Sequence, residues 1–166
     1  MADSEIIIFS DGACLGNPGP GGYAAILSWQ NRKKEISGGY RMTTNNRMEM
    51  MALIFALKAV SSKKAYKIKV YTDSKLIADA YNLDWITKWR ANGWKRNKKE
   101  FVLNPDLWIE MAKLTDIHNV EFNWVKGHAG IPENERCDFL SKQAAMADNL
   151  AIDVGYERPD DFKLFI

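Results

Sequence analysis

Two aspartates in this chain of 166 residues each follow a stretch that is typical of a β-strand. Asp11 comes after the apolar run at residues 6–9 and is predicted to lie in the glycine-rich loop that follows. Asp73 comes after residues 67–72, where apolar and polar side chains alternate. Chemistry in α/β folds is often placed at the exit of a central strand. Taken singly, however, each aspartate is more simply explained as a turn residue.

Two further acidic residues are predicted to lie on helices. Glu49 is the only charged residue between Met48 and Leu57, in a helix that is apolar nearly all round and is therefore predicted to be buried. Taken alone, Glu49 could close a capping box with Asn46, and Asp138 could be a solvated helix residue. A buried carboxylate is costly unless a cation or a donor compensates it, so Glu49 needs a partner.

The four carboxylates could converge on one pocket that holds several negative charges. Such a cluster repels itself and favours hard divalent cations, and ligand sets made only of oxygen favour Mg²⁺ or Mn²⁺ over zinc. Phosphoryl chemistry commonly uses a pair of these ions about 4 Å apart. The pattern therefore indicates metal-dependent phosphoryl chemistry.

The order of the predicted elements indicates how these carboxylates are positioned. Strands at residues 6–9, 23–29 and 35–42 are followed by a helix at about 47–60, a strand at 67–72 and a helix from 75 to about 81. A helix starting at 104–106, a strand at 120–125 and a helix from 132 to about 147 complete the order βββαβααβα. The first strands form hairpins, whereas the later strands are joined through helices. We therefore expect an α/β fold with a mixed sheet and helices on both faces.

Composition narrows the class of protein. A hydrophobic content of 46% supplies a core for one domain, and a formal net charge of +2 excludes a generally basic protein. The two cysteines, Cys14 and Cys137, lack metal-ligand spacing and indicate neither a disulfide framework nor a zinc site. The start of the chain is acidic without an apolar signal segment, and the longest apolar run, residues 50–57, is too short for a bilayer. These features predict a soluble cytoplasmic protein with no membrane contact.

One stretch is locally basic despite the balanced total. Residues 84–99 contain three tryptophans and six Lys or Arg against one Asp. Trp85 and Trp89 are four residues apart and so share a helix face. That face could bind a ligand or could equally pack against the core, with the cations simply solvated.

Five blocks carry a resemblance to a known family. They are FSDGACLGNPG at 9–19, TTNNRME at 43–49, TDS at 72–74, WVKGHAG at 124–130 and NERCD at 134–138. In this order they resemble bacterial type 1 ribonuclease H, over residues from about 6 to 147. The resemblance implies a five-stranded sheet of strand order 3-2-1-4-5. It also implies a catalytic domain at 1–147 with a basic protrusion at about 81–99, followed by a tail at 148–166 in which we find no motif.

The resemblance also implies the chemistry. Asp11, Glu49, Asp73 and Asp138 would be the catalytic carboxylates and would bind two Mg²⁺ ions, for which Mn²⁺ substitutes. His128 would assist proton transfer or product release. The expected activity is hydrolysis of the RNA strand of an RNA/DNA hybrid by a monomer, leaving 3′-hydroxyl and 5′-phosphate ends.

Two groups of residues would contact the nucleic acid. The resemblance places one group of short polar side chains against the nucleic acid, where they suit the recognition of 2′-hydroxyls in a wide minor groove. The group comprises Cys14, Asn17, Asn45 and Asn46, and Thr44 would lie near a DNA phosphate. The basic protrusion would hold the DNA strand through its cations and tryptophans, and these are Trp85, Lys88, Trp89, Trp94, Lys95, Arg96, Lys98 and Lys99.

Other functions are weighed against this one. The glycine-rich loop lacks the Lys and Ser/Thr of a P-loop, so nucleoside triphosphate binding is not expected. A non-catalytic module that binds hybrid or double-stranded RNA is disfavoured because all four carboxylates are present. A resolvase or transposase of the same fold is disfavoured by the basic protrusion and the loop around His128.

Overall fold

The structure is a computed structural model that describes residues 5–127 and 129–163. The elements in chain order are β1 (Glu5–Cys14), β2 (Gly19–Trp29), β3 (Arg32–Thr43), α1 (Asn45–Ala59), β4 (Lys67–Thr72), α2 (Lys75–Asn82), α3 (Trp85–Ala91), α4 (Pro105–Ile117), β5 (Asn119–Trp124), α5 (Pro132–Ala145), α6 (Val154–Glu157) and α7 (Pro159–Lys163). Among the described residues, no helix combines the length and the apolar character that crossing a membrane would require.

The strands form one mixed sheet, as the sequence predicts. Within the described part of the chain the sheet has five strands in the order β3-β2-β1-β4-β5. The pairs β1/β2 and β2/β3 are antiparallel, and β1/β4 and β4/β5 are parallel. The hairpin connections at the start and the helical crossovers later in the chain account for this change of direction.

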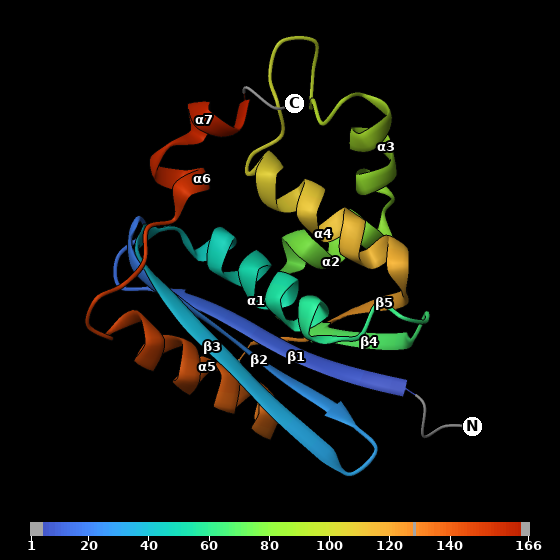
Figure 1. Cartoon of the computed structure of the whole chain (residues 1–166), viewed down its shortest axis with the longest axis vertical. Coiled ribbons are helices and arrows are strands. Elements are labelled where there is room, and N and C mark those ends of the chain that lie inside the picture. The colour runs from blue at the N-terminus through green and yellow to red at the C-terminus, as the bar shows by residue number, and fades with distance from the viewer. Residues whose placement is uncertain (1–4, 128, 164–166) are drawn as a thin grey trace.

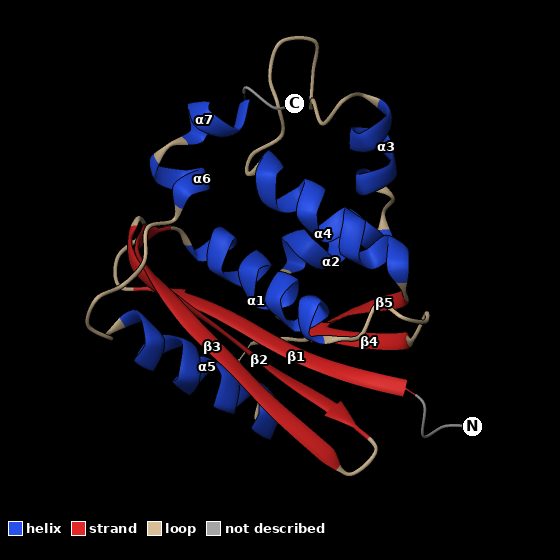
Figure 2. Cartoon of the chain, in the orientation of Figure 1, coloured by secondary structure: helices blue, strands red, loops and turns tan. Residues whose placement is uncertain are grey.

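Helices cover both faces of the sheet (Figures 1 and 2), and the prediction of this arrangement is confirmed. On one face the large core joins α1 and α4 to the sheet, with Ile8, Met48, Leu53, Ile68 and Met111 buried almost completely. On the other face α5 forms a smaller cluster with β2, in which Cys137 lies against Ala24 and Ile26. The core therefore fixes α1 and α5 on opposite sides of β1.

Helix α1 is buried because its side chains are apolar on nearly every face. Nine of its residues are buried, including Met50, Leu53 and Leu57. Its N-cap is Thr44, whose hydroxyl accepts a hydrogen bond from the backbone N–H of Arg47. Helix α2 has Ser74 as its N-cap, whose hydroxyl accepts a hydrogen bond from the backbone N–H of Ile77.

The position of Asp11 differs from the prediction. The sequence indicated a loop after residue 9, but β1 continues to Cys14 and Asp11 is paired with Ala24 of β2. Strand propensity failed here because glycine and other small residues are poor strand formers, yet they pair closely along this hairpin. The parallel pairing of β1 with β4 does end just before Asp11, at Ser10 and Thr72.

Candidate metal and nucleic-acid site

Three of the predicted carboxylates meet at one end of the sheet. Asp11 lies on β1, Asp73 directly follows β4, and Glu49 lies in the first part of α1. One carboxylate oxygen from each lies within 4.8 Å of the others. Because Ser10 and Thr72 are register partners in parallel strands, the aspartates that follow them emerge side by side.

Glycine allows the helix to approach the strand at this point. A Cβ on Gly12 would collide with the backbone nitrogen of Glu49 and with the backbone of Met48. The residue after Asp11 must therefore lack a side chain for α1 to bring Glu49 over β1. Gly12, which the sequence indicated as part of a loop, therefore allows a close contact between α1 and β1.

The cluster is electrostatically unfavourable without a cation. Burial, and next the charge of Asp73, raise the pKa of Asp11 to about 7, although its carboxylate accepts a hydrogen bond of 2.8 Å from the N–H of Gly12. Burial, followed by the charges of Asp11 and Asp73, raises the pKa of Glu49 well above its ordinary value. The Oε2 atom of Glu49 is buried without a hydrogen-bond partner among the described residues. An all-oxygen donor set with such an atom fits a hard divalent cation.

Asp138 lies apart from this trio but in the same cleft. The cleft has a volume of about 340 Å³ and is lined by Asp11, Glu49, Asp73 and Asp138 together. Asp138 is on α5, where its carboxylate accepts from the ammonium of Lys142 at 3.0 Å, one helical turn away. The fourth carboxylate is thus already paired with a cation, unlike Glu49.

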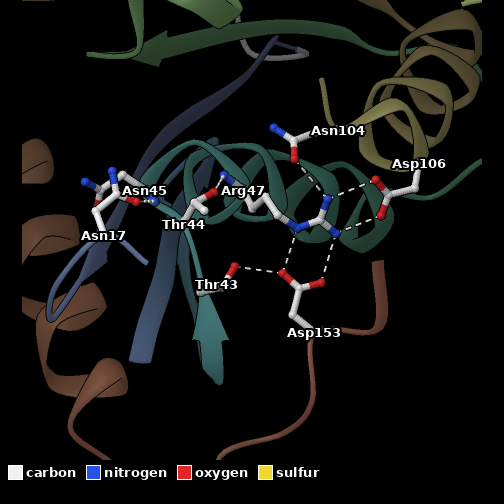
Figure 3. A network of polar contacts seen from close by, with 8 residues as sticks. All are labelled: Asn17, Thr43, Thr44, Asn45, Arg47, Asn104, Asp106 and Asp153. Carbon is white, nitrogen blue, oxygen red and sulfur yellow. Dashed lines mark hydrogen bonds and ion pairs between the residues drawn. The ribbon is translucent and has the colours of Figure 1, made fainter. Parts of the chain in front are cut away.

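A group of polar side chains adjoins the cleft, which Cys14 and Asn45 also line. We call this group the polar edge, and it comprises Cys14, Asn17, Thr44, Asn45 and Asn46. Figure 3 shows Asn17, Thr44 and Asn45. The side-chain oxygen of Asn45 accepts from the backbone N–H of Cys14 at 2.9 Å, and the N–H of Asn45 donates to the side-chain oxygen of Asn17 at 3.1 Å. Asn17, Asn45 and Asn46 are exposed. Burial raises the pKa of the Cys14 thiol to about 11, so this group is neutral near pH 7. The polar edge is a surface of neutral donors and acceptors.

The tryptophans of the basic protrusion pack inward. Trp85, Trp89 and Trp94 are partly buried and lie against the core. The Trp85 and Trp89 ring centroids are 5.9 Å apart, and those of Trp89 and Trp108 are 5.3 Å apart. The sequence left open whether the face of Trp85 and Trp89 binds a ligand or packs against the core. The structure shows packing, and the three tryptophans remain only partly buried.

The cations of the protrusion point outward. Lys88, Lys95, Lys98 and Lys99 are exposed. The Lys95 ammonium lies 5.5 Å from the centroid of the Phe101 ring, and Arg96 pairs with Glu100 at 2.7 Å. The protrusion therefore presents positive charge on a base that is fixed by aromatic packing.

Some residues that line the cleft were not predicted from the sequence. His128 lies outside the described residues. Asn134 lines the cleft with a buried Oδ1 atom that has no hydrogen-bond partner among the described residues. Lys142 was missed, although its spacing of four residues from Asp138 is a recognisable signal for a helical ion pair.

Comparison with known proteins decides the family. A sequence model of RNase H matches residues 3–146. The chain belongs to the RNase H family. A protein called Ribonuclease H from Desulforamulus reducens is 55% identical over 90% of this chain and 93% of its own length. Another with that name, from Trichodesmium erythraeum, is 51% identical over 93% of this chain and 97% of its own length. RNase H proteins are nucleases that degrade RNA in RNA/DNA hybrids, so the expected family and enzyme class are confirmed.

Solved RNase H structures share the fold. LC9-RNase H1, described as a type 1 RNase H with the type 2 active-site motif, is 30% identical with a TM-score of 0.79 over 95% of this chain and 81% of its own. LC11-RNase H1, solved with an RNA/DNA hybrid, is 23% identical with a TM-score of 0.61 over 84% of this chain and 96% of its own. The strand order and the mixed sheet agree with this fold.

Proposed function

We propose that this chain is an endonuclease that hydrolyses the RNA strand of RNA/DNA hybrids. The convergence of Asp11, Glu49 and Asp73 within 4.8 Å is the observation that carries this proposal. Family membership supports the choice of reaction, and the solved complex of LC11-RNase H1 with a hybrid supports the choice of substrate. In the reaction, water adds to phosphorus and the bond from phosphorus to the 3′-oxygen breaks, which leaves a 3′-hydroxyl and a 5′-phosphate.

The carboxylates of the cleft would hold two divalent ions, Mg²⁺ in preference and Mn²⁺ as a substitute. Asp11, Glu49 and Asp73 would hold these ions, with Asp138 completing the set from α5. Such ions activate the attacking water and stabilise the leaving oxygen. The chain's own part is to hold oxygen donors of like charge close together, and the packing of α1 on Gly12 supports this role for Glu49.

The polar edge and the protrusion would select and hold the substrate. The exposed amides of Asn17, Asn45 and Asn46 suit contacts with RNA in the minor groove. The exposed lysines of the protrusion suit the phosphates of the DNA strand. His128, which falls between β5 and α5 in the sequence, is proposed to assist proton transfer or product release.

The proposed active unit is a monomer in the cytoplasm. The four proposed metal ligands of the cleft come from one chain, so the site needs no second copy. Cys14 and Cys137 are free thiols, which suits a reducing compartment.

Cleavage assays with three duplexes test this function. The protein is incubated with labelled RNA/DNA hybrid, duplex RNA and duplex DNA, each with Mg²⁺, Mn²⁺ or EDTA. We expect metal-dependent cleavage of the RNA strand of the hybrid alone, with the end groups given above. Binding of hybrid without cleavage would instead indicate a binding module, and cleavage of duplex DNA would indicate a resolvase-like enzyme.

A further inference from the structure

The C-terminal segment beyond the RNase H match forms a buried ion pair with the start of α1. The family match ends at residue 146, and the following segment passes the end of β3 to reach α6 (Figure 1). There Asp153, which is 1% exposed, accepts hydrogen bonds from Arg47 Nε at 2.7 Å and from Arg47 Nη2 at 2.9 Å. Its Oδ2 also accepts from the Thr43 hydroxyl at 2.7 Å. One carboxylate thus joins the tail to the last residue of β3 and to the first turn of α1.

The Arg47 guanidinium is fully occupied by this network, which Figure 3 shows. Besides Asp153, it donates to Asp106 Oδ1 at 2.9 Å, to Asp106 Oδ2 at 2.7 Å and to Asn104 Oδ1 at 3.2 Å. These contacts engage all five N–H groups of the guanidinium. Burial alone would lower the pKa of Arg47, but the hydrogen bonds and charges of Asp106 and Asp153 outweigh burial and raise it. These hydrogen bonds therefore fix the orientation of the planar guanidinium. A lysine ammonium, which has three rotatable donors and no planar fork, could not make the same set of contacts.

The tail is shaped to fit this pair. A Cβ on Gly155 would collide with the Asp106 carboxylate and with Arg47 Nη2, so the backbone of α6 lies directly against the ion pair. A second, exposed link ties the same tail elsewhere, because Arg41 makes a double hydrogen bond with Glu157 at 3.0 Å for each contact. The buried Asp153 therefore links the tail to β3 and α1, and the exposed Glu157 links it to β3.

The buried link is adjacent in sequence to the polar edge. Arg47 directly follows Thr44, Asn45 and Asn46, and its backbone N–H donates to the N-cap hydroxyl of Thr44. Asn45 in turn holds Cys14 and Asn17 through its side chain and backbone. A rotation of the first turn of α1 would displace these groups together, and the network at Arg47 opposes that rotation.

We propose that the segment at residues 148–155 is a positioning element for nucleic-acid binding. Through Asp153 it fixes Arg47, and through Arg47 it holds Thr44, Asn45 and Asn46 in the geometry that the RNA/DNA hybrid requires. This inference rests on the proposed function for the identity of the ligand. Asp153 and Arg47 are positioning residues and do not contact substrate.

Asp153→Asn tests the proposal, with Glu157→Gln as the matched control. The first change weakens the buried link and the second weakens the exposed link of the same tail. We expect Asp153→Asn to raise KM for the hybrid, and its Kd measured in EDTA, by about tenfold, within the usual range for coupling between separate sites. The kcat at saturating substrate and Mg²⁺ should stay within about threefold of wild type, because the network positions binding groups. Glu157→Gln should match wild type in all three constants.

The assays are run at a temperature where circular dichroism shows each variant to be folded. If Asp153→Asn melts at a lower temperature but keeps the wild-type KM and Kd, Asp153 only stabilises the fold and the proposal is wrong. A fall in kcat at unchanged KM would also overturn it, since the network would then act on the metal site. If Asp153→Asn does not fold, Arg47→Lys, which keeps the charge and loses the planar fork, is judged by the same criteria. Wild-type protein that binds hybrid but does not cleave it would refute the proposed catalysis alone, because Kd in EDTA still tests the positioning role.

Discussion

Two buried clusters of charged side chains lie at the start of α1, one around Arg47 and one around Glu49. In the first cluster opposite charges are paired, whereas in the second like charges lie together. At Arg47, one guanidinium lies between two carboxylates, those of Asp106 and Asp153, and every donor of the cation is used. At Glu49, two residues further along, burial and then the like charges of neighbouring carboxylates raise the pKa values of Asp11 and Glu49. The described residues place no ion pair on either of them. The first cluster holds the fold together with the chain's own cation. The second leaves room for a cation from solution.

One helix thus carries a buried charge that stabilises the fold and a buried charge that suits metal binding, and the presence or absence of a partner of opposite charge distinguishes the two. A buried arginine with two carboxylates recovers its lost hydration through hydrogen bonds. Carboxylates forced together without such a partner store repulsion that a divalent ion can relieve. The two clusters should therefore respond oppositely when a charge is removed.

The largest expected effect is on activity, from Glu49→Gln. The neutral amide is a poorer ligand for a hard ion, so cleavage of the hybrid should fall by well over ~10²-fold. Stability in EDTA should not fall, because the change removes a charge from the repulsive cluster. Cleavage assays and thermal melts measure the two results. Glu110→Gln is the control, because Glu110 lies outside the cleft in a partly exposed ion pair with Lys58. Near wild-type turnover of Glu49→Gln would remove Glu49 from the site.

The next effect is on stability, from Arg47→Met. This change leaves the carboxylates of Asp106 and Asp153 buried without their cation and should cost about 3–5 kcal/mol of unfolding free energy. Urea denaturation measures it. The exposed pair of Arg136 and Glu35 provides a control, and Arg136→Met should change stability very little. Equal losses in the two variants would mean that the Arg47 cluster is no more than a surface ion pair.

A smaller effect is expected from charges that are not buried at all. Replacing Lys95, Arg96, Lys98 and Lys99 of the protrusion by Ala should weaken hybrid binding and flatten its salt dependence. The slope of the logarithm of the binding constant against log[salt] is negative, and its magnitude should decrease by roughly 0.7–0.9 for each lost phosphate contact. Binding titrations at several salt concentrations measure this slope. An unchanged slope would make the stretch a solvated surface.

The sequence predicted the acidic cluster because each of its carboxylates follows a strand or interrupts an apolar helix. Hairpins early in the chain and helical crossovers later predicted the mixed sheet, whereas the strand order was implied by the resemblance to ribonuclease H. The extent of β1 was wrong at Asp11, because small residues that look like a loop pair closely with β2. The Arg47 cluster was not predicted at all. Its partner Asp153 is 106 residues away, in a segment without a motif, and pairing at that distance leaves no local pattern.

The central claim is that Asp11 belongs to a cluster strained by like charge, and thermal melts of wild type and Asp11→Asn test it most directly. In metal-free protein the folded pKa of Asp11 is about 7, above its ordinary value of 3.8. The folded state therefore binds this proton more tightly than the unfolded state, and wild-type stability should fall as pH rises from about 4 to about 7. The pH dependence should be weaker in Asp11→Asn.

In EDTA near pH 7, Asp11→Asn should thus be inactive yet more stable than wild type, by about 1 kcal/mol or more. Added Mg²⁺ should narrow this gap, because it binds and stabilises wild type more than the variant. An Asp11→Asn protein that melts below wild type in EDTA at this pH would contradict the account, since Asp11 would then stabilise the fold through its hydrogen bonds.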